Sequence, residues 1–363
     1  MARTTIRSED ITASEVTTAK MATDPTNATN LASGTVPTAR IGAFQTITLD
    51  GTVESTPAEG DIWYASGKFY LGTSQTFTGS WSSGGSMATA RRTLAAAGTQ
   101  TAGLCFGGEI TGSPYYSALT EEYNGTAWAA GGALATARAG LAGCGTQIAG
   151  LSMGGSNTTA ELNVTEEYDG ASWSGGGNLI TARNSLTGCG TQTAGLCFGG
   201  VISSTDQVLT EEYNGTSWSS GGSLATARRF PGGAGTQSAG LCAGGYSIPA
   251  GELSSVEEYD GTSWSAGGSL STARRGGAGF GVQSDAVYAG GYNSGYLNVT
   301  ELYNGTSWSS GTNMVTARYY MAGAGTASRG LAMGGNSGAH SNLTEEYTAN
   351  GSYNELFSVS QGL

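Results

Sequence analysis

Pairs of adjacent glutamates are the residues whose type and spacing most suggest catalysis. Glycoside hydrolysis uses two carboxylates that flank one scissile bond. Five such pairs occur in equivalent contexts, at positions 121–122, 166–167, 211–212, 257–258 and 345–346. Because neighbouring residues of a strand point to opposite faces, the two members of a pair cannot act on one bond. One arginine accompanies each pair, and Leu302 replaces a glutamate in a further copy, so we interpret these carboxylates as a ring of structural Arg–Glu contacts.

The remaining reactive residue types also favour structural roles. His340 is the only histidine, whereas a copper oxidase site needs more than one imidazole ligand. The five cysteines occupy two equivalent positions of a repeat, where other copies carry Ala, Phe, Ser or Tyr, and we interpret them as reduced thiols of the core. The run from Asp260 to Trp264 resembles the Asp-box of sialidases, but its spacing is one residue short, which indicates a turn. The sequence therefore predicts no catalytic residue, no metal site and no cofactor.

Composition narrows the classes of partner. Gly contributes 62 of 363 residues and charged residues only 12%, which favours strands and tight turns over long charged helices. The net charge is −12 and the only lysines are Lys20 and Lys68, so no basic surface exists that could neutralise a row of phosphates. The sequence contains no apolar leader and no apolar run of about eighteen residues. We therefore expect no nucleic-acid partner, no membrane partner and synthesis in a cytoplasm.

One sequence pattern occurs six times, with landmarks spaced by 44 to 47 residues, the range of one propeller blade. Each copy contains a double glycine, a Thr-Glu-Glu-Tyr or close variant, a tryptophan and a Thr-Ala-Arg or similar run. Gly-rich punctuation divides each copy into four short strands. The first of them, 142–146 in the second copy, alternates Gly with small residues, which suits crowding around a narrow axis. The pattern predicts an all-β, six-bladed β-propeller.

The ends of the array are offset from one another. Trp81 has no Thr-Glu-Glu-Tyr before it, and Tyr347 is followed by Tyr353 where a tryptophan would stand. We infer that strands from both ends of the array complete one blade, which would remove the exposed edges of an unfinished ring. Seven blades are the alternative, if the hairpin predicted at 63–71 joins the ring.

The order of double glycine, tyrosine, tryptophan and Thr-Ala-Arg run resembles the kelch repeat over about residues 74–356. Kelch proteins carry a run closer to Met-Pro-Thr-Pro-Arg and a longer Tyr-to-Trp spacing, so the resemblance is to a divergent branch. It implies a six-bladed kelch-type β-propeller at 74–363, behind a connecting β-hairpin at 61–73 and an extended, low-complexity N-terminal segment at 1–60. Kelch folds serve enzymes, cytoskeletal proteins and adaptors, so the fold does not name the function.

The N-terminal segment resembles the linker sequences of tailed-phage fibre proteins. The resemblance lies in Asn27 to Arg40, in Gly60 to Tyr64 with Lys68 to Leu71, and in Thr5 to Thr12. It implies a virion protein, made in the host cytoplasm, whose residues 1–60 attach to other virion proteins and order only against partner chains, with a homotrimer as the oligomer. In such fibres the distal domain meets the host, so we expect the propeller to bind a host surface glycan or protein.

The leading hypothesis is a non-enzymatic fibre protein or adhesin that recognises a host receptor. One alternative is a capsid decoration or collar protein without receptor binding, and another is a propeller-based polysaccharide depolymerase. Isolated acid pairs in the loops would favour the enzyme, but we find only Asp206 and Glu252, singly placed. The sequence therefore favours binding over hydrolysis.

The loop after each double glycine differs most among the six copies. We expect these loops on the same face as the residues that follow each Thr-Ala-Arg run, around one mouth of the axis, where propellers often bind. Aromatic and arginine side chains are the types that carry most interface energy. The candidate ligand-binding residues are Arg92, Tyr115, Tyr116, Asn184, Arg229, Phe230, Arg275, Tyr292, Tyr319, Tyr320 and His340.

Overall fold

The computed structural model describes residues 62–65, 68–71, 79–349 and 354–358. The predicted attachment segment at 1–60 lies outside these residues. The chain divides into two units, one formed by residues 78–350 and the other by the two terminal regions. All regular elements in the described ranges are β-strands, and they include no helix that could cross a membrane.

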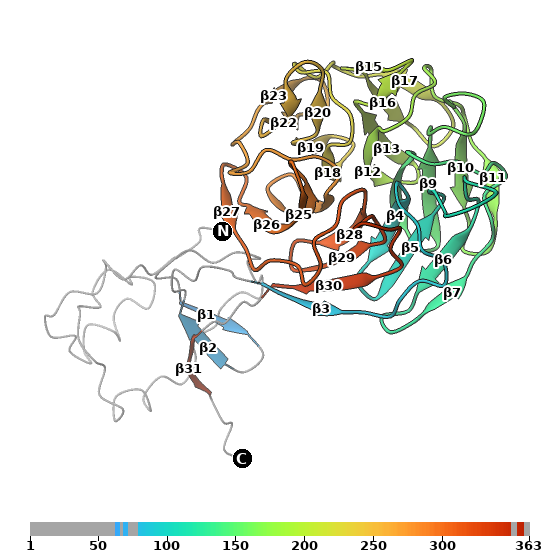
Figure 1. Ribbon diagram of the computed structural model, residues 1–363. Helices are drawn as coiled ribbons and strands as arrows, with labels where there is room; N and C mark the ends of the chain where they lie inside the picture. The colour runs from blue at the N-terminus through green and yellow to red at the C-terminus, as the bar shows by residue number, and fades with distance from the viewer. Residues whose placement is uncertain (1–61, 66–67, 72–78, 350–353, 359–363) are drawn as a thin grey trace, which may run out of the picture. The chain divides into compact units, whose positions relative to one another are not determined.

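The larger unit is a six-bladed β-propeller, as predicted (Figure 1). Each blade is a four-stranded antiparallel sheet. Blades 1 and 2 consist of β4 (Ala95–Thr99), β5 (Ala102–Phe106), β6 (Thr120–Tyr123) and β7 (Trp128–Ala130), and of β8 (Ala142–Thr146), β9 (Ala149–Met153), β10 (Thr165–Tyr168) and β11 (Trp173–Gly175). Blades 3 and 4 consist of β12 (Thr187–Thr191), β13 (Ala194–Phe198), β16 (Thr210–Tyr213) and β17 (Trp218–Ser220), and of β18 (Gly232–Thr236), β19 (Ala239–Ala243), β22 (Val256–Tyr259) and β23 (Trp264–Ala266).

Blades 5 and 6 complete the ring. They consist of β24 (Ala278–Val282), β25 (Asp285–Tyr292), β26 (Tyr296–Tyr303) and β27 (Trp308–Ser310), and of β28 (Ala322–Thr326), β29 (Arg329–Met333), β30 (Thr344–Thr348) and β3 (Ser80–Ser83). In blade 6, β3 pairs with β30 and sets Trp81 opposite Tyr347. Figure 1 shows this pairing of an early, blue strand with a late, red one. The prediction that both ends of the array complete one blade is therefore confirmed.

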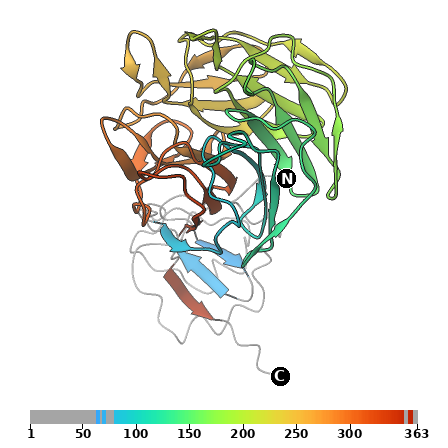
Figure 2. The same ribbon diagram turned by 45° about the vertical axis from the view of Figure 1, so that its right-hand side comes forward.

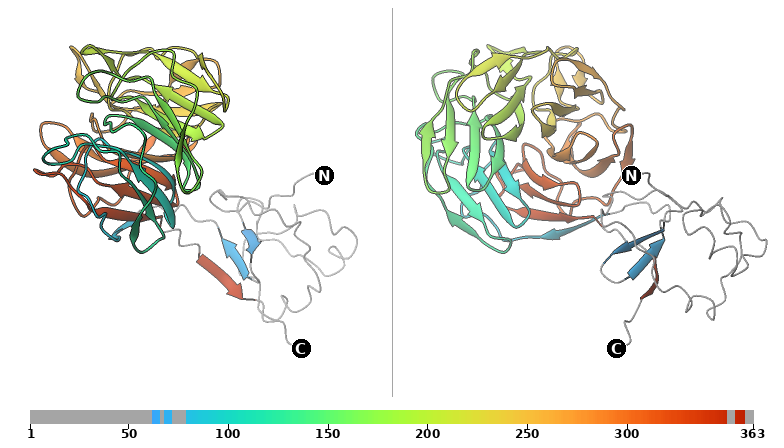
Figure 3. Two further views of the ribbon diagram at one scale, coloured as in Figure 1. Left: turned by 90° about the vertical axis from the view of Figure 1, so that its right-hand side faces the viewer. Right: turned by 180° about the vertical axis from the view of Figure 1, so that it is seen from behind.

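The innermost strands form a closed circle around the axis, in the order β4, β8, β12, β18, β24, β28 and back to β4. The view from behind in Figure 3 shows this ring from its other face. Glycine is required where these strands approach most closely. A Cβ atom on Gly323 would lie 2.5 Å from the carbonyl oxygen of Gly279, and one on Gly279 would lie 2.8 Å from backbone atoms of Gly233. The predicted crowding of Gly-rich strands at the axis is thus confirmed.

The smaller elements lie outside the six blades. Two-residue strands form short hairpins within loops, β14 (Val201–Ile202) with β15 (Thr205–Asp206) and β20 (Tyr246–Ser247) with β21 (Gly251–Glu252). In the second unit, β1 (Ile62–Ala65), β2 (Lys68–Leu71) and β31 (Asn354–Ser358) form an antiparallel sheet in the order β1-β2-β31 (Figures 1 and 2). The strand nearest the C-terminus therefore pairs with β2.

Buried arginines join each blade to the connection that leads into it. Arg91 donates to Glu121 at 2.8 Å, and the backbone N–H of Ala88 donates to the other oxygen of the same carboxylate. All six arginine side chains are fully buried. Removal of either member of a pair would leave the other as an unpaired charge in the core, which would lower the free energy of unfolding by about 3–5 kcal/mol. The pairs are Arg91–Glu121, Arg138–Glu166, Arg183–Glu211, Arg228–Glu257, Arg274–Glu301 and Arg318–Glu345. The predicted Arg–Glu ring is confirmed.

The second glutamate of each pair accepts a hydrogen bond from a tyrosine of the next blade. The hydroxyl of Tyr168 donates to Glu122 at 2.5 Å. Equivalent bonds are Tyr123–Glu346, Tyr213–Glu167, Tyr259–Glu212 and Tyr303–Glu258. Tyr347 is the sixth tyrosine of this kind. In blade 5 Leu302 replaces the second glutamate, so the hydroxyl of Tyr347 has no carboxylate acceptor there.

Two further side-chain bonds cross the blade junctions. Each tryptophan donates its indole N–H to a threonine of the preceding blade in Trp81–Thr300, Trp128–Thr344, Trp173–Thr120, Trp218–Thr165 and Trp264–Thr210. Trp308 is the exception, because Val256 replaces the threonine and its buried Nε1 has no acceptor. A glutamine such as Gln147 likewise donates to two carbonyl oxygens of the preceding blade, those of Gly103 and Tyr123. These bonds explain why the repeat carries polar residues at buried positions.

The cysteines are core residues, as predicted. All five are buried free thiols. Burial raises the pKa of Cys105 to about 11 and that of Cys197 and Cys242 to about 12. These thiols are therefore protonated at neutral pH and have little nucleophilic character.

Candidate functional site

The variable loops and the residues after each buried arginine meet at one end of the propeller. Each double glycine has left-handed backbone angles, with φ of +65° at Gly107 and +99° at Gly108, and turns the chain out of the blade. The residue after it then pairs with the residue after a buried arginine, in Arg92–Glu109, Ala139–Ser156, Asn184–Val201, Arg229–Tyr246, Arg275–Tyr292 and Tyr319–Asn336. We call these connections, with the loops 109–119, 156–164, 201–209, 246–255, 292–299 and 336–343, the loop crown.

A closed ring of backbone hydrogen bonds holds the inner edge of the loop crown. One residue per blade has a left-handed conformation here, and its N–H donates to the carbonyl oxygen of its counterpart in the neighbouring blade at 2.6 to 2.9 Å. Around the axis, the donors and acceptors follow one another as Thr93, Tyr320, Gly276, Phe230, Ser185, Gly140 and Thr93 again. Every blade is thus hydrogen-bonded to the start of the next at the inner edge of the loop crown.

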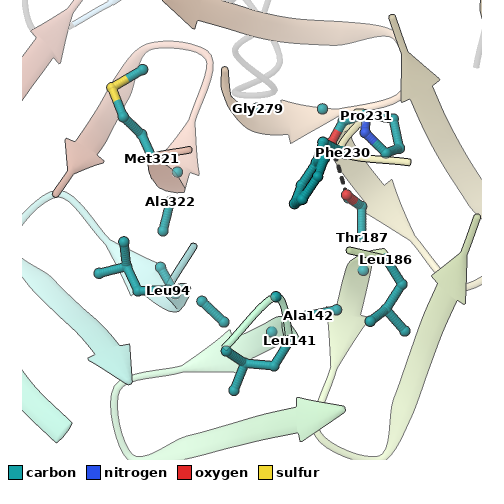
Figure 4. A pocket seen from close by; sticks show the side chains of 18 of the residues that line it. Leu94, Leu141, Ala142, Leu186, Thr187, Phe230, Pro231, Gly279, Met321 and Ala322 are labelled. Atoms are coloured by element: carbon teal, nitrogen blue, oxygen red, sulfur yellow. Dashed lines mark hydrogen bonds between the residues drawn. The ribbon is translucent and has the colours of Figure 1, made fainter. Parts of the chain in front are cut away.

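The axial cavity beneath this ring is small and is lined by glycine backbones together with a few apolar side chains. It has a volume of about 100 Å³, and its lining includes Leu94, Leu141 and Met321 (Figure 4). Figure 4 shows Phe230 pointing over the opening and Thr187 bonded to the carbonyl oxygen of Pro231. Pockets that enclose small ligands usually measure about 300–1,000 Å³. A polymer or protein ligand would therefore contact the surface of the loop crown rather than enter the axis.

The arginines of the loop crown are paired with carboxylates. Arg92 contacts Glu109 at 2.5 Å and Arg275 contacts Glu252 at 3.2 Å. Arg229 pairs with Asp206. Asp206 and Glu252, which the sequence places singly in the loops, are thus each held by an arginine.

Neighbouring loops are also linked to one another. The N–H of Ser203 donates to Glu161, and the N–H of Ile248 donates to Asp206 at 2.8 Å. The guanidinium of Arg275 lies over the ring of Tyr246, with 4.7 Å between its Cζ atom and the ring centroid. These contacts reduce the conformational entropy that the loops would lose on binding a ligand.

Aromatic side chains are concentrated on blades 4 to 6. The rings of Phe230 and Tyr320 lie 4.5 Å apart between centroids, and those of Tyr319 and Tyr320 lie 4.1 Å apart. Tyr319 in turn contacts Tyr292 at 5.1 Å and Tyr296 at 5.5 Å. We call this group the aromatic face: Phe230, Tyr246, Tyr292, Tyr296, Tyr319 and Tyr320.

The structure divides the predicted binding residues into three groups. Arg229, Phe230, Arg275, Tyr292, Tyr319 and Tyr320 belong to the aromatic face or its flanking ion pairs. A second group surrounds blade 1, where Tyr115 receives a hydrogen bond from Arg92, donates one to Glu109 and packs against Tyr116. His340 joins this group through Thr111, with 3.3 Å between His340 Nδ1 and Thr111 Oγ1. Partial burial, and to a lesser extent the nearby charge of Arg92, lowers the pKa of His340. Asn184 lies apart and bonds the hydroxyl of Ser185.

Sequence reasoning missed two members of the aromatic face, Tyr246 and Tyr296. Tyr246 was detectable, because it follows its double glycine directly, as Tyr292 does. Tyr296 had no such signal, since β25 and β26 extend beyond the usual strand length only in blade 5 and bring it opposite Tyr292.

The described residues contain no group of three His, Cys, Asp or Glu side chains that could hold a metal ion. The comparisons with known proteins add no family or relative: no protein-family model matches the chain, and no curated protein matches it.

Proposed function

We propose that this chain is a non-enzymatic phage adhesin with a divergent kelch-type propeller, which binds a receptor on the host surface through the loop crown. The observation that carries this proposal is a surface of hydrogen-bonded and ion-paired loops that is rich in tyrosine and arginine, residue types that contribute much of the energy at binding interfaces. Tyrosine offers a large, rigid contact area at a low cost in conformational entropy. Arginines engage Glu109, Asp206 and Glu252 of the loop crown, which favours binding over a depolymerase.

The direction of the chain supports the same proposal. Ser80, which begins β3, pairs with Thr348, which ends β30, so the chain enters and leaves the propeller at one place. The backbone N–H of Ala349 donates to the carbonyl oxygen of Ser328, in the turn between β28 and β29. This turn and the double glycine of blade 6 lie at opposite ends of β29. The chain therefore enters and leaves the propeller at the end opposite the loop crown, which leaves the loop crown free of the chain's own connections to its termini.

Inhibition of phage adsorption tests the proposal. Bacteria that propagate the phage are incubated with the purified full-length chain, and the adsorption rate of the phage is then measured. We expect the wild-type chain to slow adsorption, and a Tyr246→Ala, Tyr292→Ala chain to slow it much less. Ile148→Ser, at an exposed turn on the opposite end of blade 2, is the control and should act like wild type. Absence of inhibition by the wild-type chain would contradict receptor binding and favour a decoration or collar protein.

A further inference from the structure

The aromatic face is not required by the propeller scaffold. The position of Tyr246 and Tyr292 is held by Ser156 in blade 2 and by Val201 in blade 3, and the same backbone pairing forms there. Blade 2 likewise carries Ala139 where blade 6 has Tyr319. Six copies of one scaffold therefore show that small residues suffice at these positions. The aromatic side chains call for another explanation.

Two members of the aromatic face occupy an unfavourable backbone conformation. Phe230 and Tyr320 have φ of +51° and +57°, in the left-handed region that bulky residues avoid. Glycine occupies the equivalent position in blade 2, as Gly140, and in blade 5, as Gly276. Because Gly276 has no side chain, the rings of Phe230 and Tyr320 on either side of it can meet. Strained residues of this kind cluster at functional sites.

The aromatic face also lacks a free charge. Its flanking cations, Arg229 and Arg275, are paired with Asp206 and Glu252. Burial raises the pKa of Tyr319 and of Tyr320, so both phenols are uncharged at neutral pH. An acidic polymer would need a cation without a carboxylate partner, and the described arginines of the loop crown all have one. The surface offers ring faces, phenol hydroxyls and ion pairs with no excess positive charge.

From these observations, and resting on the proposed adhesin function, we infer that the aromatic face is a binding subsite for an uncharged polysaccharide. A sugar ring has one face of C–H bonds and a rim of hydroxyl groups. The C–H faces would stack on Tyr296 and Tyr319, of which Tyr296 is 43% exposed. The hydroxyl groups would bond to the phenols and to the paired side chains of Arg275 and Glu252. Tyrosine, with an apolar ring and a polar tip, suits both kinds of contact.

Affinity electrophoresis tests this inference. The full-length chain is run in native gels that contain dextran, yeast mannan, galactan or mixed-linkage β-glucan, which are uncharged, or polygalacturonate or heparin, which are acidic. We expect retardation by at least one uncharged polymer and by neither acidic one. In the Tyr296→Ala, Tyr319→Ala chain the dissociation constant should rise by about tenfold or more, as expected for loss of aromatic anchors. The matched control is Ile148→Ser, Val282→Ser, which removes two exposed apolar side chains at the opposite end of the propeller and should leave the dissociation constant unchanged.

Each outcome decides the inference. Retardation only by acidic polymers, retardation by none, or retardation that survives the Tyr296→Ala, Tyr319→Ala change would overturn it. Thermal unfolding of both variants shows whether a loss of binding reflects a loss of fold. If no uncharged polymer retards the wild-type chain but that chain still inhibits phage adsorption, the inference fails while the adhesin proposal stands. If the wild-type chain is retarded by an uncharged polymer but does not inhibit adsorption, the saccharide subsite stands and the adhesin proposal fails.

Discussion

The tryptophan at each blade junction allows a reciprocal test of the forces that hold the propeller together. Trp218 donates to Thr165 at 3.0 Å in a buried site, whereas Trp308 faces Val256 and has no acceptor. Thr165→Val removes an acceptor, and Val256→Thr supplies one. Threonine and valine have nearly the same shape, so each change mainly alters the hydrogen bond.

The structure sets the expected magnitudes. In Thr165→Val, a buried indole N–H left unpaired costs about 1–3 kcal/mol. The methyl group that replaces the hydroxyl recovers about 0.8 kcal/mol of this through apolar burial. The net loss in the free energy of unfolding is therefore about 0.2–2.2 kcal/mol. Val256→Thr should raise the free energy of unfolding by a similar amount, about 0.2–2.2 kcal/mol, because it pairs the Trp308 indole and gives up one buried methyl group.

Urea unfolding followed by far-ultraviolet circular dichroism measures both changes. The two sites lie in blades 2 and 4 and share no partner, so the double variant should equal the sum of the single variants within about 0.5 kcal/mol. It should therefore lie near wild type. If Val256→Thr destabilises the protein while Thr165→Val leaves it unchanged, the indole–threonine bonds do not stabilise the blade junctions and this explanation is wrong.

Three further predictions concern backbone, tyrosine and cysteine chemistry. Gly276→Ala places a Cβ atom 2.9 Å from the ring of Tyr320, at a residue with a φ of +64°. This change should lower the free energy of unfolding by about 1–2 kcal/mol in the same urea assay. An unchanged value would contradict the need for glycine at this position. Burial raises the pKa of Tyr123, Tyr168 and Tyr213 from 10.0 to about 12. Their contribution to the free energy of unfolding is therefore complete below pH 10 and is lost as the pH rises toward 12. Tyrosinate absorbance and circular dichroism should change together in this window, and full ionisation of these tyrosines in the native protein near pH 10 would refute the prediction. The five thiols should resist iodoacetamide at pH 8 and react in urea, as mass spectrometry would show, whereas rapid labelling of the native protein would contradict their burial.

The propeller could be predicted from sequence because the repeat supplies its own controls. Six copies reveal which positions tolerate change, and the offset between Trp81 and Tyr347 predicts the blade that both ends complete. The Arg–Glu ring was predictable because both residue types recur once per copy. The hydrogen-bond partner of each second glutamate was not predictable, since the tyrosine that donates to it comes from the next blade and lies about one repeat further along the chain.

The arrangement of the loop crown was only partly predictable. Variation among the loops identifies the loop crown, but not which of its side chains touch each other. The ion pairs of Asp206 and Glu252 cross from one blade to the next, as does the contact of Arg275 with Tyr246. The ring of backbone hydrogen bonds has no side-chain signature at all, because Thr, Gly, Ser, Phe and Tyr all occupy it.

If the propeller is a receptor-binding part of a virion, as we propose, the chain must lie where the phage particle meets its host. Mass spectrometry of the particles, combined with antibody labelling in electron micrographs, gives that position. We expect the chain to be present in the particles and the label to lie at the tips of fibres or of the tail. Label over the head, or absence of the chain from the particle, would contradict it.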